Sequence, residues 1–218
     1  QAASTATALR RITARLRRRS RLRASRSASR LLQKVLQVPR GTVYYLALNQ
    51  ANPNLAKPEV WQAVRWLVDY EGIANQLFRG QYKANQSPVA AGVSGALPEK
   101  PYKLDVAKAK ALLAKAGLAD GFSISVDAMA ASPYREIAQS LQSTFGQAGI
   151  KLDLRVAEPS QVLTRYRERR HDMIVFVWAP DYSDPSSTIE FFTRNADNAD
   201  GVANKNAAWR NRWLIPQL

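Results

Sequence analysis

The sequence predicts an α/β fold, because strand-like and helix-like segments alternate over its second half. Strand patterns cover 122–128, 151–156 and 173–178, and helix patterns cover 133–148 and 159 to about 170. Such a β-α-β-α-β succession forms a parallel sheet through right-handed crossovers. Ligands of such sheets tend to bind beyond the carboxyl ends of the strands. The loop WAPDYSDP (178–185) leaves such an end, so function is expected there.

A short amphipathic helix precedes these strands, in the phrase YKLDVAKAKALLAKAG (102–117). Asp105 is a good N-cap residue, and Gly117 stands where a helix favours a left-handed stop. Between them, one face of the helix is apolar. It carries Ala109, Leu112, Leu113 and Ala116.

The two later helices and the last strand have equally simple patterns. In 133–148, Ile137, Leu141 and Phe145 form a stripe, and Gly149 ends the helix. Segment 173–178 is a nearly continuous apolar run, which is typical of a strand covered on both faces.

The preceding part of the chain predicts a strand and helical segments. VYYLAL (43–48) is apolar on both faces, so it is expected to be a buried strand. Pro58 can open a helix, and Asp69 restarts one that reaches Gly80. Residues 81–101 are rich in proline, glycine and small side chains, and indicate a long surface loop.

Composition narrows the class of protein. The 218 residues are 46% hydrophobic, enough for one substantial core, and contain no cysteine, which excludes disulfides and thiol chemistry. No run of 18 or more apolar residues is present, so no membrane span is predicted. The formal charge is +15, but residues 1–30 hold ten arginines and no acid, which leaves 22 basic and 17 acidic residues in the remainder.

The arginine-rich arm, residues 1–30, allows three interpretations. It could neutralise phosphates of a nucleic acid or an anionic membrane. It is also similar in composition to an organelle transit peptide. The favoured interpretation is a low-complexity segment that is disordered, foreign to the fold, or translated out of frame from GC-rich DNA, followed from residue 31 by the folded lobe.

Several phrases together resemble one known family. They are YYLALNQ, PEVWQAV, WLVDYEGIANQLFRG, YKLDVAKAKALLAKAG and WAPDYSDP, in that order. Over about residues 31–213 the chain resembles the solute-binding proteins of peptide-type ABC importers, which include oligopeptide-, dipeptide- and nickel-binding periplasmic proteins. One departure is Trp61, where the family usually has an arginine.

The resemblance implies a fold and a function. The fold is one lobe of a type II periplasmic-binding-protein fold, with a mixed sheet and flanking helices. Because family members are about twice this long or more, residues 31–218 are expected to be an incomplete carboxy-terminal lobe. The complete protein would be a monomeric, non-enzymatic periplasmic receptor that closes two lobes on a peptide-like or other amine-bearing solute and delivers it to a membrane permease, without a cofactor. The competing hypothesis is a basic-arm protein that binds nucleic acid or an anionic membrane.

The resemblance also implies a ligand site in WAPDYSDP. In the peptide binders, the aspartate of a similar phrase pairs with the α-ammonium of the peptide, and by position this residue is Asp181. Trp178 and Tyr182 could provide flat apolar walls, and Asp184 is a further candidate contact. The alternative is that Asp181 and Asp184 cap their own backbone and Pro185 opens the next helix.

Other candidate sites are weaker. Asp181 and Asp184 could form an acid–base pair, but nothing else indicates catalysis. His171, the only histidine, is expected to be a solvated residue at a helix-to-strand junction, and RYRERR (165–170) a solvated basic face. One histidine and no cysteine argue against a transition-metal site of the usual kinds. Trp209 and Trp213 are expected to pack from one helix face.

Overall fold

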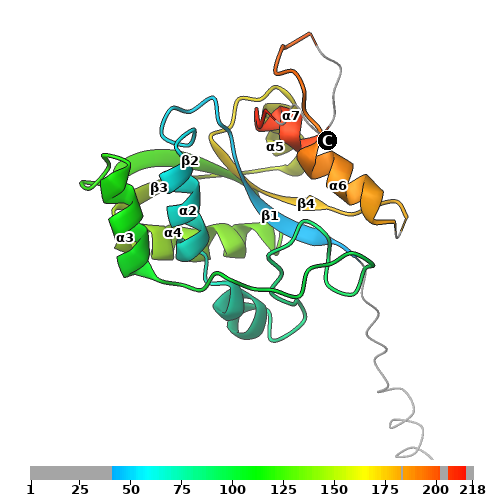
Figure 1. Cartoon of the computed structure of the whole chain (residues 1–218), viewed down its shortest axis with the longest axis horizontal. Helices are drawn as coiled ribbons and strands as arrows, with labels where there is room; N and C mark the ends of the chain where they lie inside the picture. Colours follow the sequence, from blue (N-terminus) through cyan, green and yellow to red (C-terminus); the bar gives the residue numbers. More distant parts are fainter. Residues whose placement is uncertain (1–40, 183, 202–205, 215–218) are drawn as a thin grey trace, which may run out of the picture. The chain divides into compact units, whose positions relative to one another are not determined.

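The computed structural model describes residues 41–182, 184–201 and 206–214; the arm at 1–30 and the expected start of the lobe at 31–40 lie outside this part. Four strands form one mixed sheet with the order β1-β4-β2-β3, flanked by helices (Figure 1). The strands are β1 (Val43–Leu48), β2 (Phe122–Met129), β3 (Ile150–Ala157) and β4 (Met173–Trp178). The helices are α2 (Pro58–Leu67), the π-helical segment η1 (Gly72–Leu77), α3 (Val106–Lys115), α4 (Tyr134–Gln147), α5 (Pro159–Arg167), α6 (Pro185–Thr193) and α7 (Ala207–Arg210).

The β-α-β-α-β succession is confirmed as β2-α4-β3-α5-β4. Strand β2 pairs in parallel with β3 and with β4, whereas β1 is antiparallel to β4. The register of this antiparallel pair places Val43 opposite Trp178 and Leu48 opposite Met173. The beginning of β1 therefore lies beside the end of β4.

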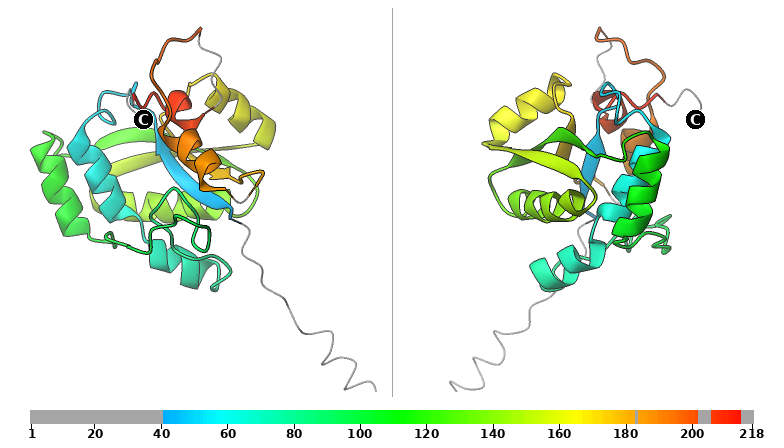
Figure 2. Two further views of the ribbon diagram at one scale, coloured as in Figure 1. Left: turned by 45° about the vertical axis from the view of Figure 1, so that its right-hand side comes forward. Right: turned by 90° about the vertical axis from the view of Figure 1, so that its left-hand side faces the viewer.

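Helices cover both faces of the sheet. Helices α2, α3 and α4 share the larger core with β2 and β4, whereas α5 covers a smaller core (Figure 1). Figure 2 shows α5 and α2 on opposite sides of the sheet. The larger core includes Val60, Leu67, Leu113, Val126, Leu141, Phe145 and Met173, and the smaller one is formed by Ala47, Val162, Tyr166 and Ile174.

Local sequence signals explain where the short helix α3 begins and ends. The Asp105 carboxylate accepts a hydrogen bond from the backbone N–H of Lys108 at 2.9 Å, which confirms the predicted N-cap. Gly117 has a φ of +74°, so the left-handed stop is confirmed as well.

Two segments of the structure differ in detail from the elements predicted for them. The helix expected between Asp69 and Gly80 is a π-helical segment, η1, which begins where Asp69 accepts a hydrogen bond from the Gly72 N–H at 2.9 Å. The loop at 81–101 is anchored more firmly than expected. The Gln86 side chain bonds both the N–H and the C=O of Tyr102, and Val89 is buried.

No helix within the described ranges is both long enough and apolar enough to cross a lipid bilayer.

Candidate functional site

The loop at 179–184 begins at the carboxyl edge of the sheet. The parallel register places Met129 at the end of β2 beside Ala157 at the end of β3, and β4 runs in the same direction. The neighbouring segments approach the loop closely. A β-carbon on Gly41 would lie 3.9 Å from Cγ of Pro180, and one on Gly95 would lie 3.7 Å from Cβ of Pro185.

Trp178, the last residue of β4, is held rigidly by helix α6. Its indole N–H donates a hydrogen bond to the Thr188 hydroxyl at 3.0 Å. Its ring stacks on Phe191 with 3.8 Å between centroids and 14° between planes. These contacts fix the plane of the indole, which is partly exposed and can form the flat wall predicted for it.

Asp184 is the N-cap residue of α6. Its carboxylate accepts a hydrogen bond from the Ser186 N–H at 2.8 Å, and its C=O accepts one from the Ser187 hydroxyl at 3.1 Å. Hydrogen bonding from Ser186 lowers the pKa of Asp184 from its usual value. Pro185 is the first residue of the helix, so the capping interpretation is confirmed for Asp184.

Asp181 and Tyr182 are exposed, and Tyr182 retains 60% of its surface. Within the described part of the chain, no hydrogen bond or ion pair involves the Asp181 side chain, in contrast to Asp184. The two predicted loop carboxylates therefore have different surroundings: one caps a helix, and the other is available to solvent.

Trp178, Asp181, Tyr182 and Asp184 lie in the loop at 179–184 or directly before it. Together they combine the fixed aromatic plane of Trp178 with the accessible carboxylate of Asp181. Such a pair can bind a ligand that carries a cation next to an apolar group. Among the described residues, no group of three or more histidine, cysteine, aspartate or glutamate side chains could hold a metal ion.

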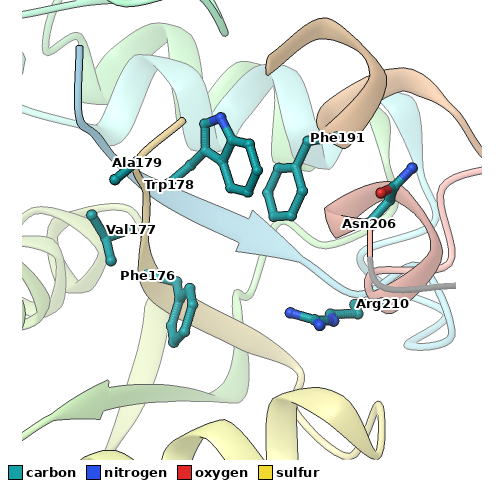
Figure 3. A pocket seen from close by; sticks show the side chains of 7 residues that line it. All are labelled: Phe176, Val177, Trp178, Ala179, Phe191, Asn206 and Arg210. Atoms are coloured by element: carbon teal, nitrogen blue, oxygen red, sulfur yellow. The ribbon is translucent and has the colours of Figure 1, made fainter. Parts of the chain in front are cut away.

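A pocket of about 410 Å³ adjoins the site on the side of α6 and α7 (Figure 3). Trp178 and Phe191 form part of its wall, and Arg210 of α7 lies at its other end. Arg210 was not among the predicted site residues, because it follows the loop by many residues in the sequence.

The prediction for His171 is wrong. Only 3% of its surface is exposed, and its Nε2 lies 2.8 Å from Oδ1 of Asn211. Burial lowers the pKa of His171 from 6.5 to about 4. The imidazole is thus a neutral core group that holds the segment after α7 against the start of β4.

The prediction of a solvated basic face at 165–170 is wrong for two of its arginines. Arg165 forms an ion pair with Asp127 of β2, which is completely buried. Arg169 is 6% exposed, and its guanidinium donates to the C=O of Asn198 at 2.8 Å and to Asp200 at 2.9 Å. The same guanidinium lies 4.2 Å from the ring centroid of Trp209. Arg167, Glu168 and Arg170 are exposed, as expected.

The two late tryptophans pack as expected but not from one helix. Trp209 is in α7 and is 8% exposed, whereas Trp213 follows the helix and its indole N–H donates to the C=O of Leu48 at 2.7 Å. Asparagines add further anchors. The Asn195 amide donates to the C=O of Trp213 at 2.8 Å, and Asn198 donates to the C=O of Arg212 at 3.0 Å.

Comparison with known proteins places this geometry in a family. The dipeptide-binding protein of Escherichia coli is 28% identical over 159 residues, which are 70% of this chain and 30% of that protein. Di/tripeptide-binding protein 1 of Pseudomonas aeruginosa is 30% identical over 153 residues, 66% of this chain and 28% of that protein. The crystal structure of a dipeptide-binding protein from a Pseudoalteromonas species in complex with Met-Leu is similar with a TM-score of 0.61 and 28% identity, over 67% of this chain and 30% of that one.

The chain spans about 30% of the length of these relatives. The model of one family, described as bacterial extracellular solute-binding proteins, family 5 middle, matches residues 5–200. This match extends over most of the chain and includes the sheet, the loop at 179–184 and all of α6. The chain therefore belongs to the family 5 bacterial extracellular solute-binding proteins.

Proposed function

We propose that this chain contributes one wall of the ligand site of a periplasmic solute receptor, which binds a peptide or another small amine-bearing solute and delivers it to an ABC permease. The named relatives are di- and tripeptide-binding proteins, which supports a peptide-like ligand. Residues 31–218 would form part of the carboxy-terminal lobe, and the ligand would be held between this lobe and a second one in a monomeric protein.

The observation that carries the proposal is the state of Asp181. Its carboxylate is exposed at the carboxyl edge of the sheet, and no described side chain neutralises it. Trp178, three residues earlier, is fixed by Thr188 and Phe191. A ligand ammonium would pair with the carboxylate while the adjoining apolar part of the ligand lies against the indole.

The energetics favour such pairing when the cleft closes. A charge-assisted hydrogen bond is roughly twice as strong as a neutral one, and exclusion of water strengthens the attraction further. In the proposed assignment Tyr182 lines the ligand as a second aromatic wall, and Asp184 positions the loop by capping α6.

The proposed function is binding without catalysis. The candidate acid–base pair is unsuited to proton transfer, because the Asp184 carboxylate is engaged in the cap of α6. The relatives are named as peptide-binding proteins, so they lend no support to the alternative in which the arm at 1–30 binds nucleic acid or an anionic membrane.

The test uses Asp181→Asn and the dipeptide Ala-Phe. We expect the unsubstituted chain to bind Ala-Phe at least tenfold more tightly than N-acetyl-Ala-Phe, because acetylation removes the ammonium charge. Asp181→Asn should weaken Ala-Phe binding at least tenfold, or about 1.4 kcal/mol, by removing the carboxylate charge. Binding is measured by amide chemical-shift titration in NMR, which reaches millimolar dissociation constants. This range is needed because weak binding is expected of a chain that spans about 30% of the length of its relatives.

Asp184→Asn is the matched control, because asparagine retains the helix cap and the chemical change is the same. In this variant the preference for Ala-Phe over N-acetyl-Ala-Phe should stay within about twofold of that of the unsubstituted chain, because Asp184 caps a helix and does not contact the ligand. Ala-Phe affinity that is unchanged in Asp181→Asn would contradict the assignment of Asp181.

A further inference from the structure

The pocket beside Trp178 has the size and the apolar walls of a ligand subsite. Its volume of about 410 Å³ lies within the range of about 300–1,000 Å³ that is typical of small-molecule sites. Phe176, Trp178 and Phe191 supply its aromatic walls, and the close-up shows the Arg210 side chain extending toward Phe176 (Figure 3).

The guanidinium of Arg210 is held in place from behind. Its carbon lies 5.0 Å from the ring centroid of Tyr166, a completely buried residue whose hydroxyl is 3.0 Å from that of Tyr45. The helix that carries Arg210 is anchored by the next residue, because Oδ1 of Asn211 lies 2.8 Å from Nε2 of His171 and its amide donates to the Tyr166 hydroxyl at 3.4 Å. Arg210 is therefore presented from a rigid element.

Arg210 also lacks an internal counter-ion. Over the described ranges, no carboxylate lies within 4.0 Å of its guanidinium, whereas Arg165, Arg169, Arg194 and Arg212 each have one. A partly buried cation at the end of an aromatic pocket has high affinity for an anion, because a guanidinium and a carboxylate can form two parallel hydrogen bonds.

We propose that this pocket binds a carboxylate carried on a flat apolar body. The carboxylate would pair with Arg210, while the apolar part packs against the aromatic residues that line the pocket, Phe176, Trp178 and Phe191. Trp178 also borders the loop of Asp181, so the group in the pocket would belong to the same solute as the ammonium at Asp181. Only this last link rests on the proposed function; the pocket and its preference for a carboxylate do not.

The experiment uses a probe that has no ammonium, so that it is independent of Asp181. The full 218-residue chain is titrated with 3-phenylpropionate and with its neutral analogue 3-phenylpropionamide. Binding is followed through the indole N–H signal of Trp178, which is assigned by its loss in Trp178→Phe. We expect the acid to bind at least fivefold more tightly than the amide and to shift this signal.

Arg210→Met keeps an apolar stem but removes the charge. It should reduce the affinity for the acid to that for the amide and leave the amide unchanged. Arg167→Met, which removes an exposed arginine of α5, is the matched charge control and should retain the preference.

Equal affinity of the unsubstituted chain for acid and amide would overturn the inference without the use of any variant. Retention of the preference in Arg210→Met would also overturn it. A preference for the acid together with no preference of Ala-Phe over N-acetyl-Ala-Phe would support the pocket and contradict the proposed function, so the two failures can be distinguished.

Discussion

The two ends of strand β4 carry similar polar residues but use them differently. At its start, His171 bonds Asn211, and Asp172 accepts hydrogen bonds from the Ser125 hydroxyl at 2.6 Å and from Asn52 at 3.0 Å. Beyond its end, Asp181 and Tyr182 are exposed, and among the residues that the structure describes neither side chain has a hydrogen bond or an ion pair.

The difference indicates which polar residues serve the fold. A buried polar group costs free energy unless it has a partner. At the start of β4, Nε2 of His171 and the Asp172 carboxylate have such partners within the chain. An exposed carboxylate with no internal partner contributes little to the fold. It is available for a ligand that brings the missing charge.

The largest expected effect is at the start of β4, where His171 should make the free energy of unfolding depend on pH. Burial lowers the pKa of its imidazole from 6.5 to about 4, so the unfolded chain binds a proton at this residue at higher pH than the folded chain does. Stability is therefore constant above about pH 6.5 with respect to this group. It falls by up to about 3 kcal/mol as the pH is lowered toward 4.

His171→Gln isolates this contribution, because glutamine cannot titrate and retains an amide that can bond Asn211. The free energy of unfolding, measured in urea between pH 4 and 8, should fall more steeply with acid in the unsubstituted chain than in the variant. Parallel curves would show that the burial of His171 does not control its protonation.

A smaller effect is expected from Asn49→Ala. Asn49 is 2% exposed, and its amide donates to the C=O of His171 at 2.9 Å and of Arg169 at 3.2 Å. Removing it leaves buried acceptors without this donor, at a cost of about 2 kcal/mol. Urea unfolding should show this loss, whereas Asn75→Ala, at an exposed asparagine, should cost less than about 0.5 kcal/mol. A loss in Asn49→Ala no larger than in Asn75→Ala would remove the basis for the contrast between the two ends.

Local signals in the sequence predicted the elements well. Asp105, Gly117 and the apolar run 173–178 were sufficient because capping, left-handed stops and strand burial depend on near neighbours. The antiparallel pairing of β1 with β4 was not predicted from the residues, since it joins segments that are far apart in the sequence.

Contacts between residues far apart in the sequence also explain the wrong predictions for His171 and Arg169. His171 and Arg169 looked exposed because the groups that bury them, Asn211 and Trp209, come about 40 residues later. Loop chemistry alone could not separate Asp181 from Asp184, because the phrase Asp-Tyr-Ser-Asp-Pro suits both a turn and a ligand site. The position of α6 separates them: Asp184 precedes its first residue, and Asp181 does not.

The smallest effects compare these two aspartates directly. Asp184→Ala should lower the Tm by roughly 2–4 °C through loss of the α6 cap, whereas Asp184→Asn should not. Asp181→Ala should change the Tm by less than about 1 °C, because no described group depends on its carboxylate. Differential scanning calorimetry can resolve these differences. An equal loss of Tm in Asp181→Ala and Asp184→Ala would mean that both carboxylates support the loop. The exposed carboxylate would then be a structural group, and the case for an ammonium ligand at this end of β4 would fail.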